Sequence, residues 1–194
     1  MGKARDRLRN SGRVAGEHSG GDFYEAQARI MGEILNKPAD IVRERTERKI
    51  YRGWEPIFKR IALFPHVREI LDTFRKQGIK MGLLSDFPPE TKLENLKLTG
   101  YWDAVLCSEL TGYLKPDSAP FLELARRMEM LPQNILYVGN SVPYDVDGAR
   151  QAGMKTALIR TGWKRLFPGI CARSSGAADF VFNDYRQLRD YVLS

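Results

Sequence analysis

The order of apolar and polar residues changes character near residue 64. Before that point, apolar residues recur every three or four positions, which is typical of helices that bury one face. The clearest apolar stripe comprises Phe23, Ala26, Ile30 and Ile34. Three helices are expected, at 22–36, at about 38–51 and at about 55–63. Residues 1–62 are therefore predicted to form a small helical unit.

After residue 63, short apolar runs alternate with amphipathic segments. The runs, each suited to a buried strand, are 79–84, 104–110, 135–139, 155–159 and 179–182. Helices are expected at 67–78, 89–97, 118–129 and 143–152, with a short helix at the end of the chain. Such alternation predicts right-handed crossovers and a mostly parallel sheet with helices on both faces. Residues 63–194 are therefore predicted to form a Rossmann-like α/β core.

Polar side chains follow the first two apolar runs, where an α/β sheet collects its ligands. Ser85 and Asp86 come directly after 79–84, and Lys115 precedes the helix after 104–110. A hydroxyl, backbone N–H groups and an ammonium group suit a phosphate, so all three residues are predicted to bind one. Two alternatives stay open: Ser85 or Asp86 caps the next helix, and Lys115 is an ordinary surface lysine.

The third run ends in a turn and a helix that carry oxygen ligands. Gly139 permits a tight turn, Asn140 follows it, and Asp145 lies in the first helical turn. Because Mg²⁺ binds one or two carboxylates and keeps several waters, Asp145 and Asn140 are candidate ligands. The alternative is that Ser141 caps the helix and Asp145 interacts with its dipole.

Composition narrows the classes of partner. The 194 residues carry a formal net charge of +7, but basic residues alternate with acidic ones, as in RERTERK at 43–49. Mixed charges favour a solvated helix face over a nucleic-acid site, and the same positive field suits a small phosphorylated substrate. The two cysteines form no C-x-x-C pair, and no segment reaches transmembrane length. A cytoplasmic protein without a membrane partner is expected.

Three motifs in this order resemble the haloacid dehalogenase-like (HAD) superfamily over about residues 64–194. LLSDF is similar to its second motif, YLKPD to its third and VGNSVPYDVDGA to its fourth. Residues 1–62 resemble the family's small helical cap. The resemblance implies a Mg²⁺-dependent phosphatase of a small phosphorylated metabolite, although dehalogenation and phosphotransfer are related chemistries.

The resemblance also implies a role for each matching residue. Ser85 would bind the phosphoryl oxygens, Lys115 would neutralise charge on them, and Asp145 would help to hold Mg²⁺. These residues are expected to gather around one anionic group, since phosphoryl transfer depends on positioning and electrostatics.

Two departures from the family pattern count against activity. The sequence contains no DxDxT motif, so the covalent step has no obvious nucleophile. Asn140 stands where the family usually has aspartate, which removes one negative charge from the metal site. A non-catalytic HAD-like protein that binds a ligand or a partner is therefore the alternative function.

The missing motif also matters for folding, because the family places its strand between those that end at Ser85 and Gly139. Unpaired strand groups cost roughly 1–3 kcal/mol each, against a domain stability of about 5–15 kcal/mol. Either the two strands pair directly, or another chain supplies the strand, or the natural chain begins about 15 to 20 residues upstream. The last is the expectation favoured here.

Overall fold

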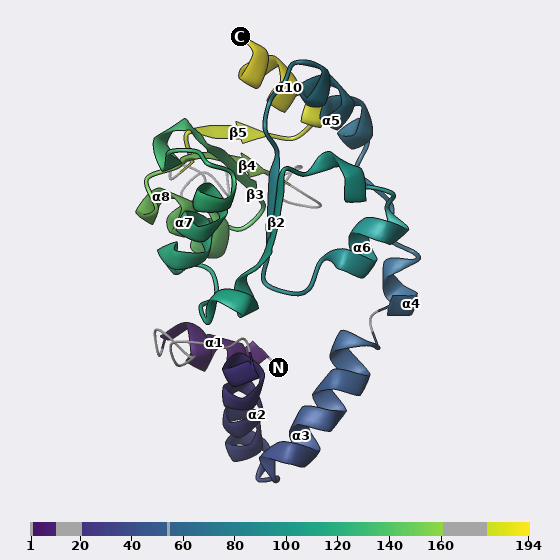
Figure 1. Cartoon of the computed structure of the whole chain (residues 1–194), viewed down its shortest axis with the longest axis vertical. Helices are drawn as coiled ribbons and strands as arrows, with labels where there is room; N and C mark the ends of the chain where they lie inside the picture. The colour runs from purple at the N-terminus through teal and green to yellow at the C-terminus, as the bar shows by residue number, and fades with distance from the viewer. Residues whose placement is uncertain (1, 11–20, 54, 161–177) are drawn as a thin grey trace. The chain divides into compact units, whose positions relative to one another are not determined.

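The computed structural model describes residues 2–10, 21–53, 55–160 and 178–194 (Figure 1). The chain divides into two compact units. The first unit comprises Met1–Ala62, Leu84–Gly100 and Leu106–Pro120. The second unit comprises Leu63–Leu83, Tyr101–Val105 and Phe121–Ser194.

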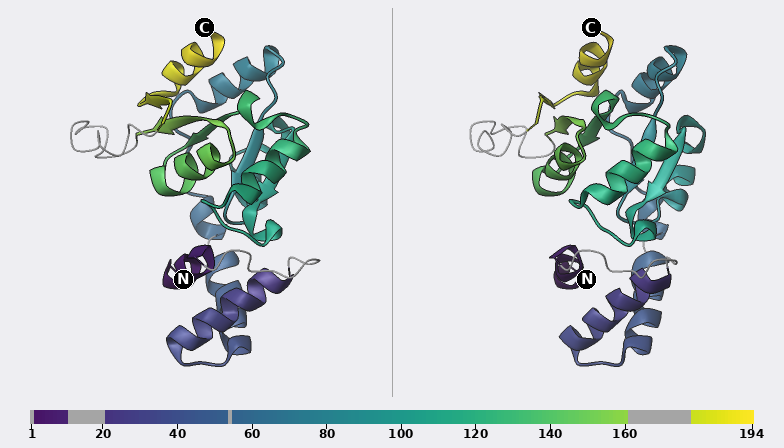
Figure 2. Two further views of the ribbon diagram at one scale, coloured as in Figure 1. Left: turned by 90° about the vertical axis from the view of Figure 1, so that its left-hand side faces the viewer. Right: turned by 60° about the vertical axis from the view of Figure 1, so that its left-hand side comes forward.

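Short helices build the first unit. They are α1 (Gly2–Asn10), α2 (Gly21–Leu35), α3 (Ala39–Thr46), the π-helical turn η1 (Glu47–Tyr51), α4 (Glu55–Phe58), α6 (Glu90–Asn95) and the 3₁₀ turn η3 (Ser108–Thr111). Figures 1 and 2 show α2 and α3 as a helical hairpin. Its connection uses Asn36, at a φ of 50°, and Pro38. The predicted helices are found, but the segment expected at 55–63 ends at Phe58.

The core of the first unit lies at the N-terminal half of α2. Phe23 and Ala26 are buried against Leu8 of α1 and Leu114. The apolar stripe does not stay buried along the whole helix, because Ile34 is 37% exposed. Helix α1 was not predicted, since Ala4 and Leu8 are its only buried apolar residues.

A parallel sheet forms the centre of the second unit. It consists of β3 (Leu136–Gly139), β4 (Lys155–Ile159) and β5 (Phe180–Phe182), with β4 in the middle. Tyr137 pairs with Thr156, and Leu158 pairs with Val181. The loop and helix after β3 are η5 (Val142–Val146) and α8 (Asp147–Gln151).

Helix α10 (Tyr185–Leu193) covers part of this sheet and also packs against α5 (Val67–Lys76) (Figures 1 and 2). Leu188 of α10 packs with Ala157 and Phe182 of the sheet. A second cluster joins Ile70 and Phe74 of α5 to Met81. Both clusters bury the apolar runs that the sequence marked as strands and helices, which confirms the α/β class.

Two further strands and a helix contribute residues to both units: β1 (Gly82–Ser85), β2 (Ala104–Cys107) and α7 (Ser118–Arg127). Strand β1 begins later than the predicted run 79–84. A Cβ on Gly82 would lie 2.4 Å from the Met128 sulfur, so a larger residue here would require the Met128 side chain to move. Strand β2 ends earlier than expected, because the residues from Ser108 onwards form η3.

The predicted strands are found, and their pairing is defined within two groups. The strands of the described residues form two ladders, β1–β2 and β3–β4–β5. Among the described strands no ladder joins β1 to β3, and the three arrangements considered for the missing strand remain predictions.

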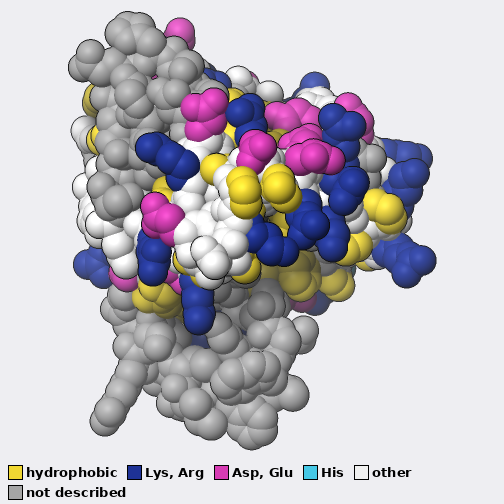
Figure 3. Space-filling model, turned by 90° about the horizontal axis from the view of Figure 1, so that it is seen from below, with side chains coloured by type: hydrophobic (Ala, Val, Ile, Leu, Met, Phe, Trp, Pro, Cys, Tyr) yellow, Lys and Arg dark blue, Asp and Glu magenta, His cyan; other side chains and the backbone are white. Residues whose placement is uncertain are grey.

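Two surface properties follow from the described residues. No helix among them combines the length and apolar character needed to cross a bilayer. On the face shown in Figure 3, basic side chains are interspersed with acidic ones, in keeping with a solvated surface.

Candidate active site

Ser85 lies at the carboxyl end of β1, in the first unit, and is half-buried. Its hydroxyl oxygen accepts a hydrogen bond from the Phe87 N–H at 3.2 Å, which tightens the turn after the strand. Helix α6 begins at Glu90 after Pro89, and no side chain caps it. The alternative in which Ser85 or Asp86 caps this helix is therefore wrong.

Asp86 connects the loop after β1 to the segment after β2. Its Oδ1 accepts hydrogen bonds from the Ser108 hydroxyl at 2.6 Å and from the Lys115 N–H at 3.3 Å. Its Oδ2 accepts one from Arg9 at 3.0 Å. A carboxylate held in this way repels a phosphate rather than binding it. The carboxylate of Asp86 therefore positions Lys115. Asp86 itself could contact a phosphate only through its backbone N–H group.

Lys115 is half-buried between η3 and α7, and the peptide bond to Pro116 is cis. Its carbonyl oxygen accepts a hydrogen bond from the Arg9 Nε at 2.8 Å. The backbone of Lys115 is thus fixed on both sides, by Asp86 through the N–H and by Arg9 through the C=O. The structure brings Ser85, Asp86 and Lys115 together in the first unit.

Asn140 and Asp145 lie together in the second unit, at the carboxyl end of β3. Asp145 is 5% exposed, and its Oδ2 accepts hydrogen bonds from the N–H groups of Asn140 and Ser141, each at 3.1 Å. The Ser141 side chain makes no capping hydrogen bond. The alternative for this loop had two parts. Asp145 does interact with the backbone N–H groups at the start of the helix, but Ser141 does not cap it.

Gly139 is required for this approach of Asp145 to the strand end. A Cβ at position 139 would lie 2.3 Å from the Asp145 Cβ and 2.8 Å from its Oδ2. Glycine therefore leaves the space that the buried carboxylate occupies.

The donor set of this loop fits a hydrated magnesium ion. The described residues contain no group of three or more His, Cys, Asp or Glu that could hold a metal. One carboxylate and one exposed amide still suit Mg²⁺, which binds few protein ligands and keeps several waters. The residues that would hold it are Asp145 and Asn140.

A buried polar network in the first unit was missed from the sequence. Glu109 is fully buried, and its Oε1 accepts hydrogen bonds from Arg5 at 2.5 Å and from the Tyr51 hydroxyl at 2.8 Å. Its Oε2 accepts one from the Tyr24 hydroxyl at 3.1 Å. The signal was present, because Glu109 is a charged residue inside the apolar run 104–110.

Burial sets the protonation of this network. Burial and then the charge of Glu109 raise the pKa of Tyr24 and of Tyr51, so both hydroxyls remain donors. Burial raises the pKa of Glu109, and the Arg5 guanidinium opposes the rise. Burial also raises the pKa of Cys107 to about 12, so this thiol is not an activated nucleophile.

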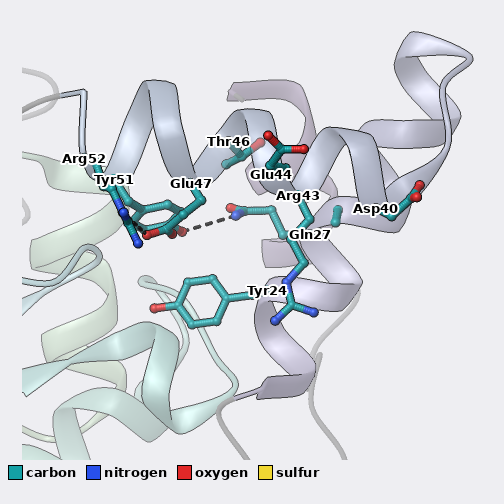
Figure 4. A pocket seen from close by; sticks show the side chains of 10 residues that line it. Tyr24, Gln27, Asp40, Arg43, Glu44, Thr46, Glu47, Tyr51 and Arg52 are labelled. Atoms are coloured by element: carbon teal, nitrogen blue, oxygen red, sulfur yellow. Dashed lines mark hydrogen bonds and ion pairs between the residues drawn. The ribbon is translucent and has the colours of Figure 1, made fainter.

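A cavity of about 450 Å³ lies in the first unit, where α2 faces α3 and η1 (Figure 4). Tyr24, Gln27 and Tyr51 form part of its wall, and the Gln27 amide donates to the Tyr51 hydroxyl at 3.2 Å. Both tyrosine hydroxyls donate hydrogen bonds to Glu109, so they belong to the buried polar network described above.

Comparison with known proteins identifies the family. Residues 24–159 match the haloacid dehalogenase-like hydrolase family, so the chain belongs to it. It is 31% identical over 139 residues to glyceraldehyde 3-phosphate phosphatase of Methanopyrus kandleri, covering 70% of this chain and 58% of that protein. The chain therefore spans less than two thirds of the length of this relative.

Solved structures share the fold. An HAD phosphatase from Thermococcus onnurineus superposes with a TM-score of 0.61 at 21% identity, over 88% of each chain. The putative HAD-hydrolase YfnB from Bacillus subtilis, solved bound to magnesium, superposes with a TM-score of 0.62 at 12% identity, over 100% of this chain and 80% of that one. These likenesses support the α/β fold that the motifs predicted.

Proposed function

We propose that this chain acts as a phosphatase of a small phosphorylated metabolite, with Mg²⁺ as its cofactor. The observation that carries the proposal is the arrangement in the first unit, where Asp86 holds the Lys115 segment beside the end of β1. Membership of the family and the similarity to a glyceraldehyde 3-phosphate phosphatase favour a phosphorylated metabolite as substrate.

Each residue has a role that its chemistry suits. The Ser85 hydroxyl donates to a phosphoryl oxygen, and the Lys115 ammonium group neutralises negative charge on the same phosphoryl group. Because Asp86 and Arg9 already hold the Lys115 backbone, this segment needs little reorganisation when charge spreads over the oxygens in the transition state. Asp145 and Asn140 of the second unit would hold Mg²⁺, which when bound would supply positive charge.

The roles proposed here are binding and electrostatic. The sequence contains no DxDxT motif, and the covalent step is assigned to none of the described residues. The experiment therefore measures turnover and binding separately.

Hydrolysis of p-nitrophenyl phosphate with MgCl₂ tests the proposal. We expect turnover by the wild type, a loss of about tenfold or more in Ser85→Ala and Lys115→Met, and none in Lys76→Met. Lys76 is an exposed lysine at the end of α5, so it controls for the change in net charge. If the wild type does not hydrolyse p-nitrophenyl phosphate, or does not bind inorganic phosphate, the proposal is wrong.

A second candidate, non-catalytic binding of a phosphorylated ligand, rests on one residue. Asn140 stands where the family usually has aspartate, which removes one negative charge from the metal site. This candidate predicts that inorganic phosphate binds to the wild type and that p-nitrophenyl phosphate is not hydrolysed. Measurable, Lys115-dependent turnover would exclude it.

A further inference from the structure

Two arginines of α1 contact the segments that carry the predicted phosphate-binding residues. Arg5 and Arg9 are four residues apart, so they lie on the same face of the helix. Their side chains are well buried, with 4% and 15% exposed respectively. Arg7, between them, is 61% exposed and faces away.

Arg5 binds both segments at once. Its guanidinium donates to the Asp86 carbonyl oxygen at 2.7 Å, after β1, and to Glu109 at 2.5 Å, after β2. It also lies over the Phe87 ring, 3.9 Å from the ring centroid. A buried guanidinium with one carboxylate partner and one aromatic face is a costly group to displace.

Arg9 repeats this pattern one helical turn further along. It donates to the Asp86 carboxylate at 3.0 Å and to the Lys115 carbonyl oxygen at 2.8 Å. Each arginine therefore connects the loop after β1 to the segment after β2. The donors are fixed in planar guanidinium groups, which a lysine could not reproduce.

We propose that Arg5 and Arg9 form an arginine clamp that positions Ser85 and Lys115 for phosphate binding. The clamp residues are positioning residues, because they hold Asp86, Glu109 and the Lys115 backbone. They are not assigned a contact with the phosphate. The inference deepens the proposed function, since it concerns the same phosphate-binding residues.

The clamp reaches the helical hairpin through Glu109. The same carboxylate that binds Arg5 accepts hydrogen bonds from Tyr24 of α2 and Tyr51 of η1. Four helical elements therefore meet at one buried acid: α1, α2, η1 and η3.

Amide hydrogen exchange tests the clamp directly. The amides of Phe87 and Lys115 donate to Ser85 and Asp86, so they report on the two clamped segments. In Arg9→Met we expect both to exchange about tenfold faster, because a charge-assisted hydrogen bond is lost. Arg7→Met is the matched control on the same helix, and in this variant the Phe87 and Lys115 amides should exchange as in the wild type. Unchanged exchange in Arg9→Met would overturn the clamp.

Affinity for inorganic phosphate, measured by calorimetry with MgCl₂, separates positioning from stability. The temperature is chosen so that the far-ultraviolet circular dichroism of Arg9→Met matches that of the wild type. Under this condition we expect Arg9→Met to bind phosphate about tenfold more weakly than the wild type. Arg9→Lys should recover part of the lost affinity. Faster exchange without loss of affinity would overturn the positioning role. If the wild type binds no phosphate, the proposed function fails, while the exchange data still decide whether the clamp exists.

Discussion

The replacement Gly139→Ala tests the geometry of the candidate magnesium loop. The added Cβ would lie 2.3 Å from the Asp145 Cβ. This separation is about 1 Å shorter than the optimal distance between two carbon atoms, which begins near 3.5 Å. The backbone of Gly139 is not in the left-handed region, so the cost arises from this contact and not from φ.

The magnitude follows from what Asp145 must give up. Moving its side chain by about 1 Å weakens the hydrogen bonds from the Asn140 and Ser141 N–H groups. A hydrogen bond to a charged group contributes roughly 1.5–3 kcal/mol, and overpacking alone costs about 1–3 kcal/mol. We therefore expect Gly139→Ala to lower the free energy of unfolding by about 3 kcal/mol.

Urea unfolding followed by circular dichroism measures this loss. Gly100→Ala is the matched control, since a Cβ at Gly100 meets no atom within 4 Å, and it should change stability by less than about 0.5 kcal/mol. Calorimetric titration with MgCl₂ should also show weaker binding in Gly139→Ala. If Gly139→Ala is as stable as Gly100→Ala and its Mg²⁺ affinity is unchanged, the contact between position 139 and Asp145 does not constrain this loop.

Two further predictions concern pH and charge. The hydrogen bonds from Arg126 and then from Arg127 lower the pKa of Glu123 to about 2. Glu123→Gln should therefore lower the free energy of unfolding by about 0.5 kcal/mol at pH 7. In urea unfolding, this difference from the wild type should disappear as the pH falls from 4.5 to 2. Arg5→Met removes the main influence that lowers the pKa of the buried Glu109, so the pKa of Glu109 rises further. The free energy of unfolding of Arg5→Met should therefore fall as the pH rises above about 4.5. At pH 8 we expect a loss of about 3–5 kcal/mol. Adding Glu109→Gln to Arg5→Met should recover stability at pH 8; a double variant as unstable as Arg5→Met would contradict this explanation.

Local patterns in the sequence predicted the elements of the fold well. Each of the five apolar runs overlaps a strand, because a short apolar run is stable where both of its faces are buried. Ser85 and Lys115 were selected as candidate phosphate-binding residues for a similar reason. Ser85 directly follows a predicted strand, and Lys115 lies just before a predicted helix. Such signals depend on neighbouring residues alone.

Pairing and burial over long distances were not predictable in the same way. Arg5 and Glu109 are 104 residues apart in the chain, and no local pattern joins them. Helix α1 was missed because its inward face combines two small or apolar residues with an arginine, which a search for apolar stripes does not detect. The division of the strands into two ladders also depends on partners distant in sequence.

The central claim is that Lys115 and Ser85 bind the phosphoryl group of the substrate. The most direct test is the dissociation constant of inorganic phosphate, measured by isothermal titration calorimetry in MgCl₂ for the wild type, Lys115→Met, Ser85→Ala and the control Lys76→Met. We expect Lys115→Met to weaken binding about tenfold to a hundredfold, Ser85→Ala to weaken it less, and Lys76→Met to leave it unchanged. Equal dissociation constants in the wild type and Lys115→Met would contradict this claim.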